Sequence, residues 1–117
     1  MSYLLLIMER GERHTWSPET RRQRYDDMMA FGERLKARGL YQASNSLRSD
    51  SDGVRVQQRD GKRLITEGPF AEAKEIVGGF FLIDCRTREE AIAIAGECPA
   101  AGWASVEVRE IGPCYEG

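Results

Sequence analysis

Several features that would point to a particular class of protein are missing from this chain of 117 residues. No apolar run approaches the roughly 18–20 residues that a membrane-spanning helix needs. The apolar stretch Tyr3–Met8 has no basic lead-in and runs directly into Glu9, so it predicts a β-strand rather than a signal peptide. The sequence therefore predicts a cytoplasmic protein with no membrane partner.

An excess of positive charge is also missing, because 17 Lys and Arg residues face 19 Asp and Glu residues. A nucleic-acid-binding surface needs such an excess to neutralise phosphates, so we expect no nucleic-acid partner. The three cysteines, Cys85, Cys98 and Cys114, form no close pair, and His14 is the sole histidine. These counts predict neither a disulfide framework nor a metal site, and no phosphate-binding glycine loop or other cofactor motif is found.

The remaining composition, with 41% hydrophobic and 31% charged residues, is typical of one globular domain spanning residues 1–117. Apolar periodicity and turn residues predict the order strand, helix, strand, hairpin, strand, helix, strand. Asp60-Gly61 is a strong signal for the hairpin turn. The predicted strands are 3–8, 40–47, 54–58, 63–66, 76–85 and 105–111.

Both predicted helices have clear start signals. Ser17-Pro18-Glu19 is typical of a helix N-terminus, and Gly39 of a left-handed C-terminal residue. Thr87 and Glu90 have the spacing of a capping box, which predicts a second helix that ends before Pro99. The apolar spacing predicts a buried stripe on each helix: Tyr25, Met28, Met29, Gly32 and Leu35 on the first, and Ala91, Ile94, Ala95 and Cys98 on the second.

Two of the strands, Tyr3–Met8 and the one containing Phe80 and Phe81, are apolar on both alternating faces. Two helices can cover one face of such a sheet. Leaving several hundred Å² of apolar sheet exposed would forfeit on the order of 10 kcal/mol at roughly 25 cal/mol per Å², which is comparable with the stability of a small domain. The sequence therefore predicts a homodimer in which a second copy covers the other face.

The segment from Glu67 to Asp84, EGPFAEAKEIVGGFFLID, closely resembles the signature of the DGPF-type proteins of the YCII-related family, with Glu67 in place of the usual aspartate. The opening strand, Gly39 and the closing Ser105–Arg109 strand fall in the order that this family has. The resemblance implies an α+β, ferredoxin-like antiparallel sheet with two helices on one face, which pairs sheet to sheet as a dimeric α/β barrel. The hairpin near residues 54–66 is an addition to that fold.

The resemblance has two functional implications. Some relatives in the superfamily are small-molecule enzymes such as muconolactone isomerases and a dehydrochlorinase, and YCII-type enzymes use a histidine on the first helix, at a position that we place near Met28. Other DGPF-type proteins are encoded beside extracytoplasmic-function sigma factors, which implies a regulatory role with a sigma-factor partner.

The residues themselves indicate one polar cluster in which proton transfer is feasible. Glu67, Glu72 and Lys74, with Glu75, could form an acid/base and anion-binding group at a cavity mouth. We assign Glu67 as the candidate base, Lys74 as the stabiliser of negative charge and His14 as an outside candidate. The alternative is structural: Gly68 and Pro69 shape a turn that Phe70 anchors, and His14 belongs to a solvated loop.

The apolar wall of that cavity would come from Tyr3, Phe70 and Phe81, which suit a flat metabolite but could equally pack the sheet. Gly78-Gly79 predicts a β-bulge more strongly than a ligand contact. Arg21, Arg22 and Arg24 predict a solvated helix face more strongly than an anion patch.

The leading functional hypothesis is therefore a small-molecule-binding domain, with cofactor-free isomerase or lyase chemistry if it turns over a substrate. Its ligand would lie between the sheet and the residues around 67–74. The alternative is a non-catalytic interaction or sensor domain that works with a sigma factor. The sequence leaves open which of the two applies.

Overall fold

The computed structural model describes residues 1–70 and 74–117. Its strands and helices follow the predicted order, with boundaries within a few residues of those expected. Short 3-10 turns lie between them, including η1 (Arg13–Thr15), η2 (Asp50–Asp52) and η3 (Pro99–Gly102). The helices and strands are β1 (Ser2–Glu9), α1 (Pro18–Ala37), β2 (Tyr41–Ser46), β3 (Val54–Arg59), β4 (Lys62–Glu67), β5 (Ile76–Asp84), α2 (Arg88–Glu97) and β6 (Ser105–Glu110).

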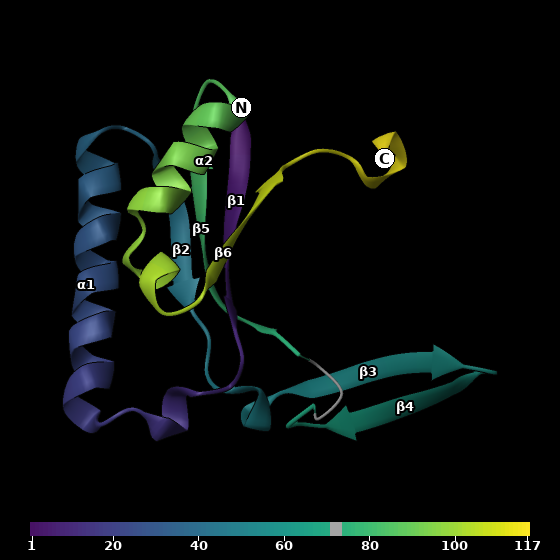
Figure 1. Ribbon diagram of the computed structural model, residues 1–117. Coiled ribbons are helices and arrows are strands. Elements are labelled where there is room, and N and C mark those ends of the chain that lie inside the picture. The colour runs from purple at the N-terminus through teal and green to yellow at the C-terminus, as the bar shows by residue number, and fades with distance from the viewer. Residues whose placement is uncertain (71–73) are drawn as a thin grey trace.

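Four of the strands form one antiparallel sheet in the order β2-β5-β1-β6 (Figure 1). This order, with a helix after the first strand and another before the last, is that of a ferredoxin-like α+β fold. Residues of both helices join one core with alternate residues of β1 and β5. Both helices therefore pack on the same face of the sheet, as predicted.

The two faces of this sheet differ sharply in burial. On the face under the helices, Tyr3, Leu5 and Ile7 of β1 are at most 5% exposed. The alternate residues point to the other face and are only half-buried, although all are apolar; they are Leu4, Leu6, Met8, Phe80 and Leu82. We call this second surface the open face. The prediction that β1 and β5 are apolar front and back is confirmed.

Helix α1 begins and ends as its sequence predicts. The Ser17 hydroxyl accepts a hydrogen bond from the Thr20 backbone N–H at 3.1 Å, and Gly39 has a left-handed φ of +71°. The predicted burial of its apolar stripe is confirmed for Gly32 and Leu35 and wrong for two other members. Tyr25 and Met29 are 49% and 50% exposed, whereas Phe31, absent from the predicted stripe, is 1% exposed.

Helix α2 has half of the predicted capping box. The Thr87 hydroxyl accepts from the Glu90 backbone N–H at 3.1 Å, as expected. The Glu90 carboxylate does not return the bond to Thr87 but accepts from the backbone N–H of Arg86 at 3.1 Å. The extended backbone of Thr87 and the length of the glutamate side chain place that earlier amide within reach. Ala91, Ile94 and Ala95 are buried as predicted.

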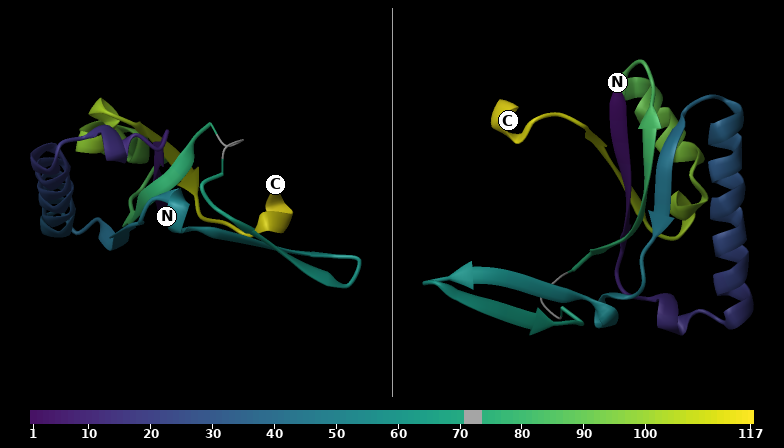
Figure 2. Two further views of the ribbon diagram at one scale, coloured as in Figure 1. Left: turned by 90° about the horizontal axis from the view of Figure 1, so that it is seen from below. Right: turned by 180° about the vertical axis from the view of Figure 1, so that it is seen from behind.

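The hairpin formed by β3 and β4 is a separate two-stranded sheet that projects away from the rest of the molecule (Figures 1 and 2). Asp60 and Gly61 both have positive φ, 52° and 74°, as a tight hairpin turn requires. All twelve strand residues are exposed. We call residues 53–68 the arm.

Candidate functional site

One candidate site is a cavity of about 470 Å³ between α1 and the face of the sheet that the helices cover. Helix α1 supplies eight of its lining residues at spacings of one, three or four, from Arg21 to Lys36. These positions share one face of the helix and span about 22 Å at 1.5 Å per residue. The cavity is therefore a long groove beneath α1. Its other lining residues include Ile7, Glu9, Arg13, Trp16, Tyr41, Ser44, Phe81 and Trp103.

This groove explains why Tyr25 and Met29 of the stripe on α1 are not buried. Tyr25, Met28, Met29 and Gly32 were correctly predicted to share a face, and all four line the groove. At Gly32 an added Cβ would lie 3.5 Å from Phe81 Cε1, an ordinary contact distance, so α1 lies close to β5 at this point. The groove extends along α1 on either side of this contact.

One end of the groove carries an arginine stacked against two indole rings. The Arg24 guanidinium carbon lies 4.3 Å from the centre of the Trp16 ring and 4.7 Å from that of Trp103. The two rings are nearly perpendicular, at 82°, with centres 6.3 Å apart. Trp16 precedes α1 and Trp103 follows η3. Two segments distant in the sequence, the start of α1 with the residue before it and the end of η3, therefore meet at Arg24.

The cations at this end are not neutralised by acids. Within the described residues, neither Arg21 nor Arg24 has a carboxylate at ion-pair distance. Arg22, the residue after Arg21, instead pairs with Asp26 at 3.0 Å and has a side chain 78% exposed. The prediction of a solvated arginine face is thus confirmed for Arg22 and wrong for Arg24, which the helical spacing to Met28 places over the groove.

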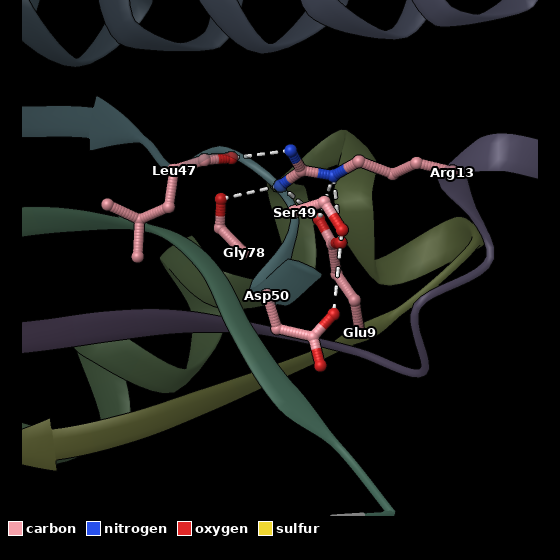
Figure 3. A network of polar contacts seen from close by, with 6 residues as sticks. All are labelled: Glu9, Arg13, Leu47, Ser49, Asp50 and Gly78. Carbon is pink, nitrogen blue, oxygen red and sulfur yellow. Dashed lines mark hydrogen bonds and ion pairs between the residues drawn. The ribbon is translucent and has the colours of Figure 1, made fainter. Parts of the chain in front are cut away.

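The acids that line the groove are already paired. The Glu9 carboxylate accepts two hydrogen bonds from Arg13, at 2.7 Å from Nη2 and 2.8 Å from Nε (Figure 3). At 12% and 28% side-chain exposure, this is a sheltered, bidentate pair. Glu33 accepts from Lys36 Nζ at 3.1 Å at the far end, and that pairing raises the pKa of Lys36.

The guanidinium of Arg13 also ties three chain segments together (Figure 3). It donates to the carbonyl oxygens of Leu47 and of Gly78, the latter at 2.7 Å. Gly78 is the extra residue of a β-bulge opposite Ile7 and Met8, which confirms the predicted bulge. A Cβ at Gly78 would come within 2.0 Å of Glu9 Oε1, so glycine is required for this pair to lie against β5.

A second cavity of about 350 Å³ adjoins the groove. It shares Glu9, Trp16 and Trp103 with the groove, and its other lining residues are mainly polar or small, including Arg10, Glu12 and Glu75. Unlike the groove, it offers little apolar surface to a ligand.

The residues singled out from the sequence lie elsewhere. Glu67 at the end of β4, Lys74, and His14 in η1 are exposed, and none lines either cavity. Glu72 lies outside the described residues. The groove lies beneath α1, and the cavity expected beside residues 67–74 stays a prediction. The proposed chemical roles of Glu67, Lys74 and His14 stay predictions.

The predicted apolar wall is divided between three places. Phe81 lines the groove beneath α1, and its predicted role in ligand binding stays a prediction. Tyr3 lies in the hydrophobic core at 2% exposure and lines neither cavity, because β1 presents it to the interior between the two helices and the sheet. Phe70 packs at the base of the arm, where the Arg55 guanidinium carbon lies 3.8 Å from the centre of its ring.

Comparisons with known proteins agree with the fold. The model of the YCII-related domain family matches residues 1–114. The chain is similar to an uncharacterized protein of Rhizobium meliloti (strain 1021), with 30% identity over 100 residues that cover 82% of this chain and 79% of that protein. In the part of the chain that the structure describes, no helix is long and apolar enough to cross a membrane.

Proposed function

The chain belongs to the YCII-related family, and we propose that it binds a small, flat, anionic and partly apolar organic molecule in the groove beneath α1. The observation that carries this proposal is Arg24, held between Trp16 and Trp103 at one end of the groove. Two perpendicular rings restrict where this guanidinium can lie, and a guanidinium can donate two parallel hydrogen bonds to a carboxylate.

The charge of the groove supports an anion. Four cations and two acids line it, and each acid is paired with a cation, Glu9 with Arg13 and Glu33 with Lys36. Arg21 and Arg24 remain as the uncompensated pair in the described residues. A carboxylate or phosphate on the ligand would neutralise them, whereas a cationic ligand would be repelled.

The middle of the groove supports an apolar body. Met28 and Met29 from α1 face Ile7 and Phe81 from the sheet. Methionine side chains are flexible and polarisable, so they adapt to a ligand of irregular shape, and sulfur contacts aromatic rings favourably. The Tyr41 and Ser44 hydroxyls, 2.7 Å apart, add a polar contact at the far end.

The same groove favours binding over proton transfer. Met28, near the position where the family resemblance places a catalytic histidine, cannot accept a proton, and both acids of the groove are engaged by cations. This supports the sensor reading of the protein. Proton transfer by Glu67 and Lys74 is the weaker hypothesis, because both are exposed away from the cavities of the single chain.

The open face supports the second part of the proposal, a homodimer. Five apolar side chains of β1 and β5 are only half-buried there. The edge strand β6 places Glu107 beside Leu6 and Arg109 beside Leu4. A second copy would bury these apolar side chains against the open face of its own sheet, in the sheet-to-sheet arrangement that the family resemblance implies. We place the dimer in the cytoplasm and assign it to the DGPF-type subgroup as part of this proposal.

The ligand proposal is tested with neighbouring arginines on α1. Arg24→Gln removes the stacked cation, whereas Arg22→Gln removes an exposed one and serves as the matched control. Titration calorimetry with a panel of aromatic carboxylates, each paired with its neutral methyl ester, should show binding of an acid and not of its ester. We expect Arg24→Gln to weaken that binding by about 1.5–3 kcal/mol, the contribution of a charged hydrogen-bonding partner, and Arg22→Gln to leave it unchanged.

Two outcomes contradict the proposal. One is equal weakening by both substitutions, which would indicate a general charge effect. The other is wild-type protein that binds none of the acids and releases no small molecule in native mass spectrometry after purification from cells. Melting temperatures of both variants within a few degrees of wild type ensure that loss of binding is not loss of folding.

A further inference from the structure

We infer that the arm, residues 53–68, is an interaction surface that packs along a second copy of this chain. The inference rests on the homodimer proposed above and specifies a second region that holds it together. It starts from the isolation of the arm, which projects from the molecule in every view (Figures 1 and 2). A two-stranded hairpin is at best marginally stable in water without a surface to pack on.

The arm is nevertheless built to point in one direction. At its base the Gly68 N–H donates to the Gly53 carbonyl at 2.8 Å, and the Phe70 N–H donates to the Asp50 carboxylate at 3.1 Å. A Cβ at Gly68 would come within 1.9 Å of the Asp50 carbonyl oxygen, so the strands leave the body through a close fit that only glycine allows. Phe70 lies against Arg55 on the other side.

One face of the arm carries most of its exposed apolar side chains, beside Gln58, Arg63 and Glu67. Residues directly opposite each other on paired strands share a face, and Val56 pairs with Ile65 while Val54 pairs with Glu67. Val54, Val56 and Ile65 therefore lie on one face, and they are 55%, 60% and 53% exposed. Gln57 and Leu64 lie on the opposite face, together with Arg55, Arg59 and Lys62. The first face is the one expected to pack on a partner.

Charge identifies the partner as another copy of this chain. The arm holds four of the 17 basic residues and two of the 19 acidic ones, so the rest of the chain holds 13 basic and 17 acidic residues. The arm thus has a net charge of +2 and the body of −4, and each would attract the other across two copies. A two-fold dimer would use both arms at once, because each copy offers the same arm and the same body.

The test removes the arm without disturbing its base. In the variant, two glycines replace residues 54–67. The hydrogen bond from the Gly68 N–H to the Gly53 carbonyl then joins the first and last residues of a four-residue β-turn and can be kept. Sedimentation velocity across a concentration series measures the dimer dissociation constant of the full chain and of this variant. We expect removal of the arm to raise that constant at least tenfold while the melting temperature of the monomer stays unchanged.

A matched pair of substitutions locates the packed face. Val56→Asp and Gln57→Asp introduce the same charge at adjacent positions on opposite faces of the arm. We expect Val56→Asp to raise the dissociation constant at least tenfold and Gln57→Asp less than threefold. Hydrogen exchange should show arm amides that are protected at concentrations where the full chain is dimeric and unprotected after dilution.

The outcomes separate this inference from the homodimer on which it rests. An armless chain that dimerises as tightly as the full chain overturns the role of the arm and leaves the sheet-to-sheet dimer standing. Arm amides that stay unprotected in the dimer, or become protected only when another protein is added, also overturn it. A full chain that remains monomeric at all concentrations overturns both, whereas the ligand titration of the Arg24 variant is unaffected by any of these results.

Discussion

The two faces of strands β1 and β5 are both apolar and have very different surroundings. Leu5 and Leu6 are neighbours in β1, yet Leu5 is 0% exposed under the helices while Leu6 is half-buried on the open face. The difference shows that apolar character in a strand does not say what covers it. Only the placement of α1 and α2 makes one face the core of the monomer.

The face under the helices is itself uneven. Near α2 it is closed, because small residues such as Ala91 and Ala95 let the helix approach the sheet. Near α1 it leaves the groove, where Tyr25 and Met29 remain half-exposed. The protein thus has a dense core beside a site that is open to a ligand, on the same side of one sheet.

The largest expected effect comes from breaking the contrast between the two faces directly. We expect Leu5→Ala to lower the free energy of unfolding by about 2–5 kcal/mol, because it leaves a void in a closed core. Leu6→Ala should cost less, and its cost should depend on protein concentration if a second copy covers the open face. Chemical denaturation at two protein concentrations measures both. Equal and concentration-independent losses would show that the open face is not an interface.

A smaller effect is expected where β5 bulges. Gly78→Ala would force a Cβ into the Glu9–Arg13 pair, so we expect a loss of about 1–3 kcal/mol in the free energy of unfolding, as for other overpacked sites. Gly96→Ala in α2, where the structure has no atom within 4 Å of the added Cβ, is the control and should not destabilise. Urea denaturation of both variants makes the comparison. A fully stable Gly78→Ala would mean that the pair does not hold the segments together.

The groove is expected to respond in the opposite direction. Gly32→Ala adds a methyl group at ordinary contact distance from Phe81 and replaces a glycine inside a helix, so we expect a gain of about 0.5–1 kcal/mol in stability. Because that methyl group enters the groove, ligand affinity should fall. Gly96→Ala should gain stability in the same way without loss of affinity, and titration calorimetry would distinguish the two.

The smallest effect concerns the buried thiols. Burial raises the pKa of Cys98 and of Cys85 above the ordinary value of 9.0. A thiol whose pKa is higher in the folded state binds more protons folded than unfolded near that pH, so the stability it contributes is complete below pH 9 and is lost as the pH rises through the folded pKa. Denaturation at pH 7, 9 and 10 should show this loss, and Cys114→Ala, at an exposed cysteine, should not alter it.

Much of the fold could be predicted from local signals. Ser17, Gly39, Thr87 and the Asp60-Gly61 turn fix where elements begin and end through contacts within a few residues. The bulge at Gly78 was also predictable, because two adjacent glycines inside a strand are unusual. The bond that the Glu90 carboxylate accepts from the Arg86 N–H was not predictable. A flexible glutamate side chain can reach either of two neighbouring backbone amides, and no sequence signal distinguishes them.

The candidate site was much less predictable. Trp103 lies far along the sequence from Trp16 and Arg24, so no motif in the sequence joins the three. The conspicuous charged segment around Glu67 and Lys74 attracted the prediction instead, yet its described residues lie at the base of the arm and beyond it. The one signal that could have been used is the helical spacing that puts Arg24 on the same face as Met28.

The sequence by itself determined the order of elements, their caps, the hairpin turn and the presence of apolar residues on both faces of β1 and β5, because each depends on neighbours within a turn or along a strand. The tertiary structure decided which face became the core, that a groove remains beneath α1, and that an arginine lies against two tryptophan rings. Those outcomes depend on how distant segments pack, and the free energy of that packing is shared among residues that no local pattern brings together.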